Sequence, residues 1–325
     1  RRFMASPRSD VAITPLAFLQ PVGLSPFEAN AVMALAGRND STVQWQRPPP
    51  DSPPDVYVAH LRSVDLAEDG TDSTPPWTMD RYPPRVVVDE RGHYQGRPVC
   101  LLGGCESTHL AWNSGDAEAI GELNTGLRFA AAQLSRQRIR YALGRVAWLN
   151  RDAWASSRLH LVSHGQVVAM IDPAQWQVHL RRAATAIQVE RVALQVLPAR
   201  PVAPSPDFET LPMASALWEL ARRCNEEALP RLLPRGFLKS RLVRSTPLPI
   251  PMAELDEQSQ MILGELDLAP RTVAQLRTKC KLPEPTLTRA LAGLAVSRAT
   301  RAASAGMSAR RIFGRVIGWL PGMRR

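Results

Sequence analysis

Basic residues near the C-terminus form the pattern in this sequence that most directly suggests chemistry. Residues 231–325 contain 17 Lys or Arg against 6 Asp or Glu, a net charge of +11, whereas residues 1–230 contain 23 against 24. A basic segment beside a near-neutral one is typical of a region that binds a polyanion. DNA, RNA and an anionic membrane surface are candidate partners. Solubility or an acidic protein partner would explain the same charge.

Three short helices are predicted to carry these basic residues. Apolar residues at helical spacing predict helices over 254–266, 273–279 and 285–294, and Thr272 is the expected N-cap of the second helix. The last two helices are joined by a short turn, which is the pattern of a helix-turn-helix, and residues 295–303 would add a small hairpin. Over residues 256–303 the pattern resembles the winged-helix family, which implies a DNA-binding or a protein-docking domain.

The winged-helix resemblance makes the third helix the recognition helix, whose outward side chains would meet the bases. Only Arg289 among them could make a bidentate contact to guanine. Basic residues beside the turn and in the hairpin could contact phosphates, which position a protein without reading the sequence. The candidate nucleic-acid-binding residues are Arg277, Lys279, Lys281, Thr286, Thr288, Arg289, Arg298 and Arg301.

Three arginine pairs are candidates for a different ligand, and one of them, Arg310 and Arg311, is in the C-terminal tail. Arg181 and Arg182 end a predicted strand, and Arg222 and Arg223 are placed opposite the apolar stripe of a helix predicted over 208–229. Guanidinium groups suit guanine and phosphate, so the pairs could hold a nucleotide messenger such as cyclic di-GMP. Exposure to solvent is the alternative interpretation.

Strands and helices alternate in the first part of the chain. Apolar runs predict strands over 16–22, 42–46, 56–61, 86–88, 99–102 and 109–112, and helices over 26–37 and 117–143. Ser25 and Glu28 are expected to form a capping box at the start of the first helix, and Pro26 suits its first position. Residues 62–84 are polar and rich in proline, so a loop is expected there. This alternation indicates an open, mainly parallel sheet.

At this point residues 14–135 resemble the receiver domain of bacterial two-component signalling. The resemblance rests on residues 23–28 at the first helix, 55–61 at the third strand and 98–102 at the fourth. It implies an acidic pair that holds magnesium after the first strand, and an aspartate that accepts a phosphoryl group after the third.

The positions that match the receiver's working residues carry other side chains. Gln20, Pro21 and Val22 stand at the acidic pair, and His60 stands at the phosphoacceptor. Gly103 stands where the family has Thr or Ser, and Asn113 or Ser114 stands where the family has Lys. Without clustered carboxylates magnesium has no hard oxygen ligands. The resemblance therefore implies a pseudo-receiver that serves as a docking or dimerisation surface. We expect His60 to be a buried histidine rather than a residue that replaces aspartate as the phosphoacceptor.

Short apolar runs in the middle of the chain predict an antiparallel meander. The runs cover residues 159–163, 166–172 and 176–180, and the meander could begin as early as residues 145–149. His160 and His179 could face each other across strands, but two histidines without a third ligand make a poor metal site.

The expected fold class is an α/β N-terminal receiver-like domain, a β-rich middle segment and a mainly α C-terminal winged-helix domain. The expected segments are disordered residues 1–13, the receiver-like domain 14–143, the β-meander domain 144–197, a Pro-rich linker 198–207, a helical connector 208–250, the winged-helix-like domain 251–304 and a basic amphipathic tail 305–325.

Catalytic, metal and cofactor sites are not expected. The sequence has no P-loop, nucleophile elbow, zincin or EF-hand motif, and its acidic residues are scattered. Cys100, Cys105, Cys224 and Cys280 lack the spacing of a zinc site and are expected to be reduced thiols. No apolar run has the length of a transmembrane helix, and the first residues do not resemble a secretory signal, so a cytoplasmic location is expected.

The sequence therefore predicts a non-enzymatic bacterial regulator with a phosphorylation-incompetent receiver-like domain and a DNA-binding output domain. The alternatives are an adaptor that binds a protein partner, and an effector of a cyclic dinucleotide. A homodimer is also open, and the tail over 307–320 could lie on an anionic membrane.

Overall fold

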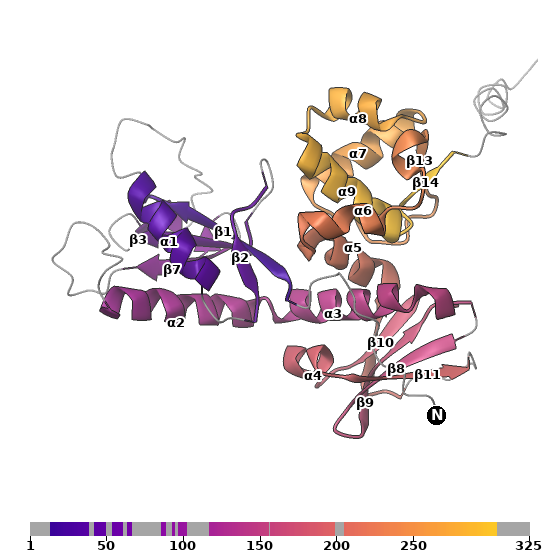
Figure 1. The fold of residues 1–325 in the computed structure, drawn as a ribbon, viewed down its shortest axis with the longest axis horizontal. Coiled ribbons are helices and arrows are strands. Elements are labelled where there is room, and N and C mark those ends of the chain that lie inside the picture. The colour runs from indigo at the N-terminus through magenta and orange to yellow at the C-terminus, as the bar shows by residue number, and fades with distance from the viewer. Residues whose placement is uncertain are drawn as a thin grey trace, which may run out of the picture.

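The structure, a computed structural model, describes residues 14–38, 42–49, 54–60, 64–66, 86–88, 93–94, 97–102, 117–155, 157–198 and 205–303. These residues form a parallel sheet with helices, an antiparallel sheet and a group of C-terminal helices (Figure 1). Both α and β elements therefore contribute, as the sequence predicts. The predicted segments 1–13, 109–112 and 305–325 lie outside the described residues.

The N-terminal sheet has the strand order β2-β1-β3-β7-β6. Its first four strands are parallel, and β6 is antiparallel to β7. β1 and β3 are central strands that are buried along most of their length, with Gln20 of β1 exposed, which explains why their sequences are mostly apolar rather than alternating. The strands are β1 (Leu16–Val22), β2 (Gln44–Gln46), β3 (Val56–His60), β6 (His93–Tyr94) and β7 (Arg97–Leu102).

Two helices, α1 (Pro26–Arg38) and α2 (Ala117–Gln133), pack on the same face of this sheet, where their apolar residues share one cluster with those of β1, β3 and β7. The predicted capping box is confirmed: the backbone N–H of Ser25 donates to Glu28 Oε2 and that of Glu28 donates to Ser25 Oγ. The predicted loop over 62–84 is wrong in part, because β4 (Val64–Leu66) pairs in parallel with β5 (Val86–Val88).

The predicted helix over 117–143 is two helices, since α2 ends at Gln133 and α3 (Ser135–Leu149) begins after Leu134. Figure 1 shows the two in line, α2 below the parallel sheet and α3 above the antiparallel sheet. The early start of the meander at 145–149 is wrong, because these residues belong to α3. Ile139, Leu143 and Ala147 lie on its buried side at helical spacing.

The middle of the chain forms a five-stranded antiparallel sheet in the order β11-β8-β9-β10-β12. The predicted meander is confirmed as β8 (Ser157–Ser163), β9 (Gln166–Asp172) and β10 (Gln177–Arg181). The sequence did not predict β11 (Ala193–Pro198), which pairs with β8, nor the short helix α4 (Ala186–Glu190).

The predicted helix over 208–229 is wrong in its first and last parts. Residues Phe208–Pro212 are strand β12, which completes the sheet beside β10, and helix α5 (Met213–Arg223) follows with Pro212 as its N-cap. Pro212 suits this boundary because its fixed φ and missing N–H are tolerated at a helix start. After α5 come η3 (Glu226–Ala228) and α6 (Leu229–Leu232).

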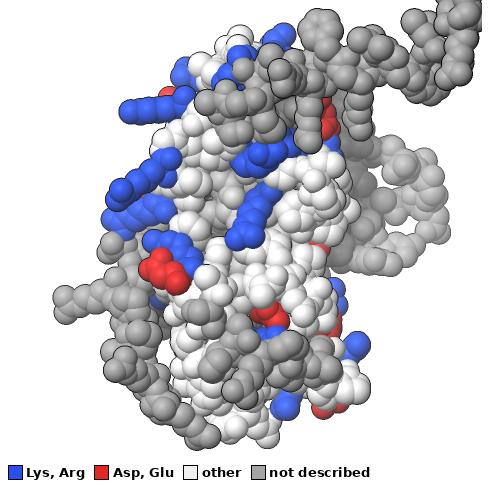
Figure 2. Space-filling view, turned by 90° about the vertical axis from the view of Figure 1, so that its right-hand side faces the viewer, with Lys and Arg blue, Asp and Glu red and all other residues white. Residues whose placement is uncertain are grey.

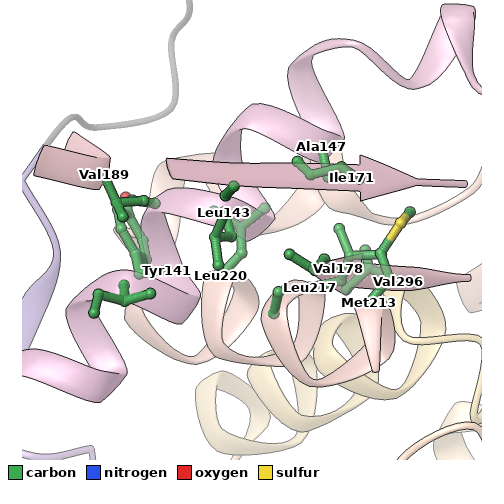
Figure 3. Packing of buried hydrophobic residues seen from close by; sticks show 14 of the residues in the cluster. Tyr141, Leu143, Ala147, Ile171, Val178, Val189, Met213, Leu217, Leu220 and Val296 are labelled. Carbon is green, nitrogen blue, oxygen red and sulfur yellow. The ribbon is translucent and has the colours of Figure 1, made fainter. Parts of the chain in front are cut away.

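The largest apolar cluster lies between the antiparallel sheet and helices α3 and α5 (Figure 3). Tyr141, Leu143 and Ala147 of α3 and Leu217 and Leu220 of α5 face Ile171 and Val178 of the sheet. The two helices cross with their backbones in contact at Gly144, where an added Cβ would lie 2.1 Å from the carbonyl oxygen of Ala216.

The C-terminal part contains the three predicted helices, α7 (Glu257–Leu268), α8 (Val273–Cys280) and α9 (Glu284–Val296). Thr272 caps α8 as predicted, in a capping box with Gln275, and Asp256 caps α7. The predicted hairpin over 295–303 is wrong, because α9 continues to Val296. β14 (Thr300–Ala302) pairs instead with β13 (Leu242–Arg244), which precedes α7.

None of the described helices is both long enough and apolar enough to cross a membrane. The remaining described elements are the 3-10 turns η2 (Arg151–Ala153), η4 (Phe237–Lys239) and η5 (Met252–Glu254).

Candidate functional site

Helix α9, the predicted recognition helix, is largely covered by α5. Thr286 and Arg289 are 4% and 9% exposed, and Thr288 is half-buried. At Gly293 an added Cβ would lie 3.0 Å from Trp218 of α5, so the two helices approach closely. The expectation that Arg289 points outward, where it could meet guanine, is therefore wrong.

Arg289 instead binds the C-terminal end of α5. Its Nη1 donates to the carbonyl oxygens of Ala221, Arg222 and Cys224, at 3.2, 3.0 and 2.7 Å. The last carbonyls of a helix have no partner within the helix, so a buried cation is a favourable partner for them. Arg289 thus fixes the position of α5 relative to α9.

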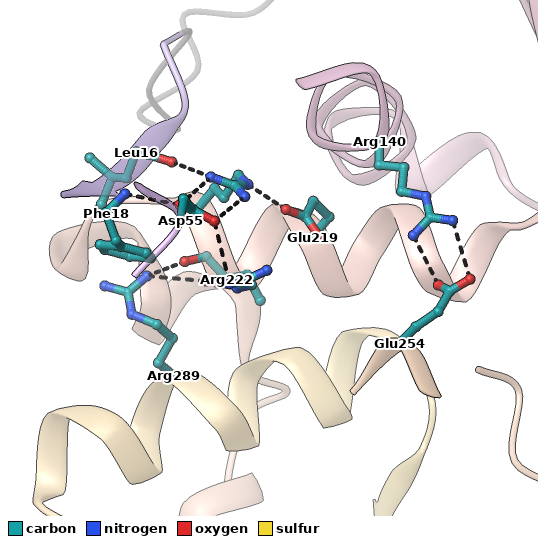
Figure 4. A network of polar contacts seen from close by, with 10 residues as sticks. Leu16, Phe18, Asp55, Arg140, Glu219, Arg222, Glu254 and Arg289 are labelled. Carbon is teal, nitrogen blue, oxygen red and sulfur yellow. Dashed lines mark hydrogen bonds and ion pairs between the residues drawn. The ribbon is translucent and has the colours of Figure 1, made fainter. Parts of the chain in front are cut away.

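The adjacent Arg223 forms the most buried polar network among the described residues (Figure 4). Its Nη1 and Nη2 donate to both carboxylate oxygens of Asp55, each at 2.9 Å, and its Nε donates to Glu219 one turn earlier in α5. Nη1 also donates to the carbonyl of Leu16 at 2.9 Å. Asp55, Glu219 and Arg223 are 2%, 3% and 1% exposed, so three charges are held away from water.

The charges of this network compensate one another. Burial by itself raises the pKa of the Asp55 carboxyl, but the positive charges of Arg223 and Arg222 outweigh it, and the pKa falls to about 2. The backbone N–H of Phe18 donates to the same carboxylate at 2.9 Å. The network therefore joins β1 and the start of β3 to α5 with every charge paired.

Within the described residues, the candidate ligand pairs 181–182 and 222–223 have different partners. Arg222 lies 3.5 Å from Asp55 and 5.7 Å from the ring centre of Trp218, so both Arg222 and Arg223 already have internal partners. The placement of Arg223 opposite the apolar stripe is wrong, because the Asp55 carboxylate draws it inward. Arg181, at the end of β10, donates to Gln166 at 2.7 Å and lies over Phe208, and Arg182 is exposed beside it.

The other predicted phosphate contacts are exposed. Arg277 faces Glu284 at 3.6 Å, whereas Lys279, Lys281 and Arg301 have no acidic partner among the described residues. Arg235, Lys239 and Arg241 are exposed in the same way. We refer to Arg235, Lys239, Arg241, Lys279, Lys281 and Arg301 as the unpaired cations.

Two of the unpaired cations, Arg241 and Arg301, belong to the small β13–β14 sheet and its edge, which lie near the start of α8. Arg301 in β14 is opposite Val243, and Arg241, just before β13, donates to the carbonyl of Pro270 at 3.4 Å. Figure 2 shows the side of the molecule that is on the right in Figure 1, where Lys and Arg outnumber Asp and Glu in the upper half. This arrangement could hold phosphates, since it offers charge without a fixed acidic counterpart.

Arg298, the remaining candidate, lies on an aromatic pair. Its Cζ is 3.6 Å from the ring centre of Trp176 and 5.9 Å from that of Trp154. The residue is still exposed on its outer side. It is therefore positioned more firmly than the unpaired cations.

Histidines and cysteines do not assemble into a site. His160 and His179 are each opposite Met170, on the two strands that flank β9, so the expected facing pair is wrong. His60 is buried. Burial raises the thiol pKa values of Cys100 and Cys224 to about 11, which makes them unreactive. Within the described residues no group of His, Cys, Asp or Glu could hold a metal ion, and Cys105 lies outside them.

The sequence did not single out Asp55 and Glu219. Glu219 stands four residues before Arg223, which is the spacing of an intrahelical ion pair. Asp55 directly precedes the apolar, buried strand β3. These two patterns were available signals for a buried network.

Comparison of the chain with protein-family models, curated proteins and solved structures finds no match.

Proposed function

We propose that the protein is a non-enzymatic regulatory protein in which a receiver-like N-terminal domain is coupled to a C-terminal domain that binds DNA through its phosphates. The observation that carries the proposal is the exposure of the six unpaired cations in the C-terminal part, beside a helix α9 that is covered by α5. The expected affinity for DNA comes mainly from charge and depends little on the base sequence, because phosphate contacts do not read bases.

The receiver-like interpretation is supported by strand order. The parallel strands β2-β1-β3-β7 follow the order 2-1-3-4 that begins the flavodoxin-like arrangement. Functional acids of such a sheet belong at the carboxyl ends of the strands, where this chain has Val22 and His60. Asp55 is at the opposite, amino end of β3 and is bound to Arg223, so it does not supply the missing phosphoacceptor. A docking role without phosphoryl transfer follows.

Coupling between the two ends of the chain is supported by three arginines. Arg223 connects α5 to the N-terminal sheet, Arg289 connects α9 to α5, and Arg140 of α3 makes a two-pronged contact with Glu254 before α7, at 3.1 and 3.2 Å. A partner that shifts the N-terminal sheet would therefore act on the orientation of the C-terminal helices.

A titration of the full chain with a short labelled DNA duplex tests the proposal. We expect affinity to fall steeply between about 50 and 200 mM salt, because binding releases counterions from the phosphates. The variant Lys279→Ala, Lys281→Ala, Arg301→Ala should reduce the slope of log affinity against log salt by about 3. Its matched control removes three exposed arginines of other regions, Arg128→Ala, Arg136→Ala, Arg191→Ala, and should keep the slope. Equal loss in both variants, or no binding at low salt, would contradict the proposal.

A second candidate function, protein docking, is favoured by the exposed apolar side of α7. Met261 and Leu268 are 41% and 75% exposed, and Gly264 lies between them on the same side of the helix. Sedimentation of the full chain tests whether this side joins two copies. Leu268→Glu should then convert a dimer to a monomer, and a concentration-independent monomer in the unchanged protein would exclude the homodimer.

A further inference from the structure

Arg298 and two tryptophans form a built cluster where the antiparallel sheet meets the C-terminal helices. The guanidinium of Arg298 is in contact with the face of Trp176, at 3.6 Å, and the rings of Trp176 and Trp154 meet edge to face at 5.3 Å and 85°. Trp176 packs against both the sheet cluster and the cluster of α7, α8 and α9. The cation therefore lies on a rigid aromatic surface.

The turn that carries Trp176 is held by several hydrogen bonds. Asp172 Oδ1 accepts from the backbone N–H groups of Ala174 and Gln175, at 3.1 and 3.2 Å, and the carbonyl of Trp176 accepts from Met213 at 3.0 Å. Trp154 is fixed separately, because its Nε1 donates to the carbonyl of Ala147 at 3.0 Å. The backbone of the turn and the ring of Trp154 are thus held by hydrogen bonds that do not involve Arg298.

The backbone is unusual at both ends of the contact. Trp176 and Arg298 have φ values of +57° and +61°, in the left-handed region that side chains other than glycine rarely adopt. Such conformations cost free energy and persist where the surroundings impose them, often at sites that bind ligands. Here they bring one particular guanidinium onto one particular indole.

Arg298 has no acidic partner among the described residues, and no hydrogen bond from its guanidinium is present there. Arg298 is exposed, and its five N–H donors lie in the plane of the guanidinium group, so a ligand can reach this group while its Cζ lies over Trp176. A ligand that fits must offer a flat π-system for the face and anionic oxygens for the edge. A nucleotide has both.

We propose that Arg298, Trp176 and Trp154 form a binding site for a purine nucleotide. The purine stacks on the outer face of the Arg298 guanidinium, in a base–guanidinium–indole stack, and a phosphate accepts hydrogen bonds from the guanidinium edge. The nucleotide is either free, as a mono- or cyclic dinucleotide, or an unpaired residue of a nucleic-acid strand. The site does not depend on the proposed duplex contact, since its residues are not among the unpaired cations.

The test is calorimetric titration of the full chain with guanosine monophosphate, guanosine and inorganic phosphate, compared between two glycine variants. Arg298→Gly removes the guanidinium and relieves the positive φ, because glycine adopts this region freely. His164→Gly is the matched control: it also replaces an exposed residue with a positive φ, of +48°, and it lies outside the unpaired cations. Thermal unfolding of both variants checks that they fold.

We expect the monophosphate to bind the unchanged protein and His164→Gly alike, and to bind Arg298→Gly at least about tenfold more weakly. Arg298→Lys, which keeps the charge and loses the planar group, should weaken binding similarly. Absence of binding, equal binding by all variants, or equal binding of phosphate and guanosine monophosphate would overturn the assignment.

Two further ligands distinguish the sources of the nucleotide. Cyclic di-GMP binding more tightly than the monophosphate, with the same dependence on Arg298, assigns the site to a free messenger. A purine-rich single strand that binds more tightly with that dependence assigns it to a strand. The triple variant of Lys279, Lys281 and Arg301 should retain monophosphate binding, so failure of the duplex proposal and failure of this site give different results.

Discussion

The C-terminal ends of α5 and α8 carry similar basic residues and use them in opposite ways. α5 ends in Arg222 and Arg223, and α8 carries Arg277 and Lys279 in its last turn. Those of α5 turn into the molecule and bind Asp55, whereas those of α8 face solvent. Helix-end cations are favourable at both places because of the helix dipole, so the dipole does not decide between them.

The difference follows from what surrounds each helix. Ten of the eleven residues of α5 are buried, since it lies between the antiparallel sheet, α3 and α9. α8 buries Leu276 and Cys280 on one side only. A cation at the end of a central helix must find a charge partner, and a cation at the end of a peripheral helix remains available to bind a ligand.

Replacement of Arg223, at the end of the central helix α5, should have the largest effect on stability. Arg223→Met leaves Asp55 and Glu219 buried without their partner, which should lower the free energy of unfolding by about 3–5 kcal/mol. Lys279→Met, on α8, should change it by no more than about 0.5 kcal/mol. Urea unfolding followed by circular dichroism measures both, and similar values for the two variants would contradict the distinction between the helices.

Glycine substitutions test the central position of α5 next. Gly144→Ala places a methyl group against the backbone of α5 at Ala216, and this overpacking should cost about 1–3 kcal/mol. Gly264→Ala on α7 meets nothing within 4 Å and should stabilise the protein by about 0.5–1 kcal/mol, because alanine favours the helix. Thermal unfolding should therefore shift in opposite directions, and a shift of the same sign would contradict the packing argument.

The buried charge network should also make the free energy of unfolding depend on pH, and this effect is smaller than that of removing Arg223. The pKa of Asp55 is about 2 in the fold against 3.8 as the ordinary value, so the folded state binds fewer protons between these values. Its stabilisation is complete above pH 4 and is lost as the pH falls towards 2, by about 2 kcal/mol. Asp55→Asn should flatten this part of the profile of unfolding free energy against pH.

An exposed carboxylate serves as the control for the loss of a carboxylate. Asp267 pairs with Arg244 and is half-exposed, so Asp267→Asn should change the free energy of unfolding at neutral pH by no more than about 0.5 kcal/mol. An Asp55→Asn profile that keeps the full slope would show that other groups cause the acid sensitivity.

Most elements whose apolar residues recur at a regular spacing could be predicted from the sequence. The strands over 16–22 and 166–172 and the helix over 273–279 agree with β1, β9 and α8 to within a residue. The errors arise where a residue pattern fits two structures. Residues 208–212 continue an apparent helical stripe, and only pairing with β10 makes them a strand.

The candidate site was less predictable than the fold. Lys279, Lys281 and Arg301 are exposed as a phosphate-binding role requires, but Arg223 and Arg289 are buried. Whether an arginine faces inward depends on a partner distant in the chain, which local periodicity does not record. The contact of Arg298 with Trp176 likewise joins the residues that follow α9 to the turn between β9 and β10 of the antiparallel sheet.

The ion pair between Asp55 and Arg223 spans 168 positions in the chain, and this separation sets an order of events during synthesis. At about 5–20 residues per second, the ribosome adds Arg223 roughly 10–30 s after Asp55. During that interval the N-terminal sheet lacks the cation that neutralises its carboxylate. Its final consolidation therefore awaits α5, and a nascent chain halted before residue 223 should be a better substrate for chaperones than one halted after it.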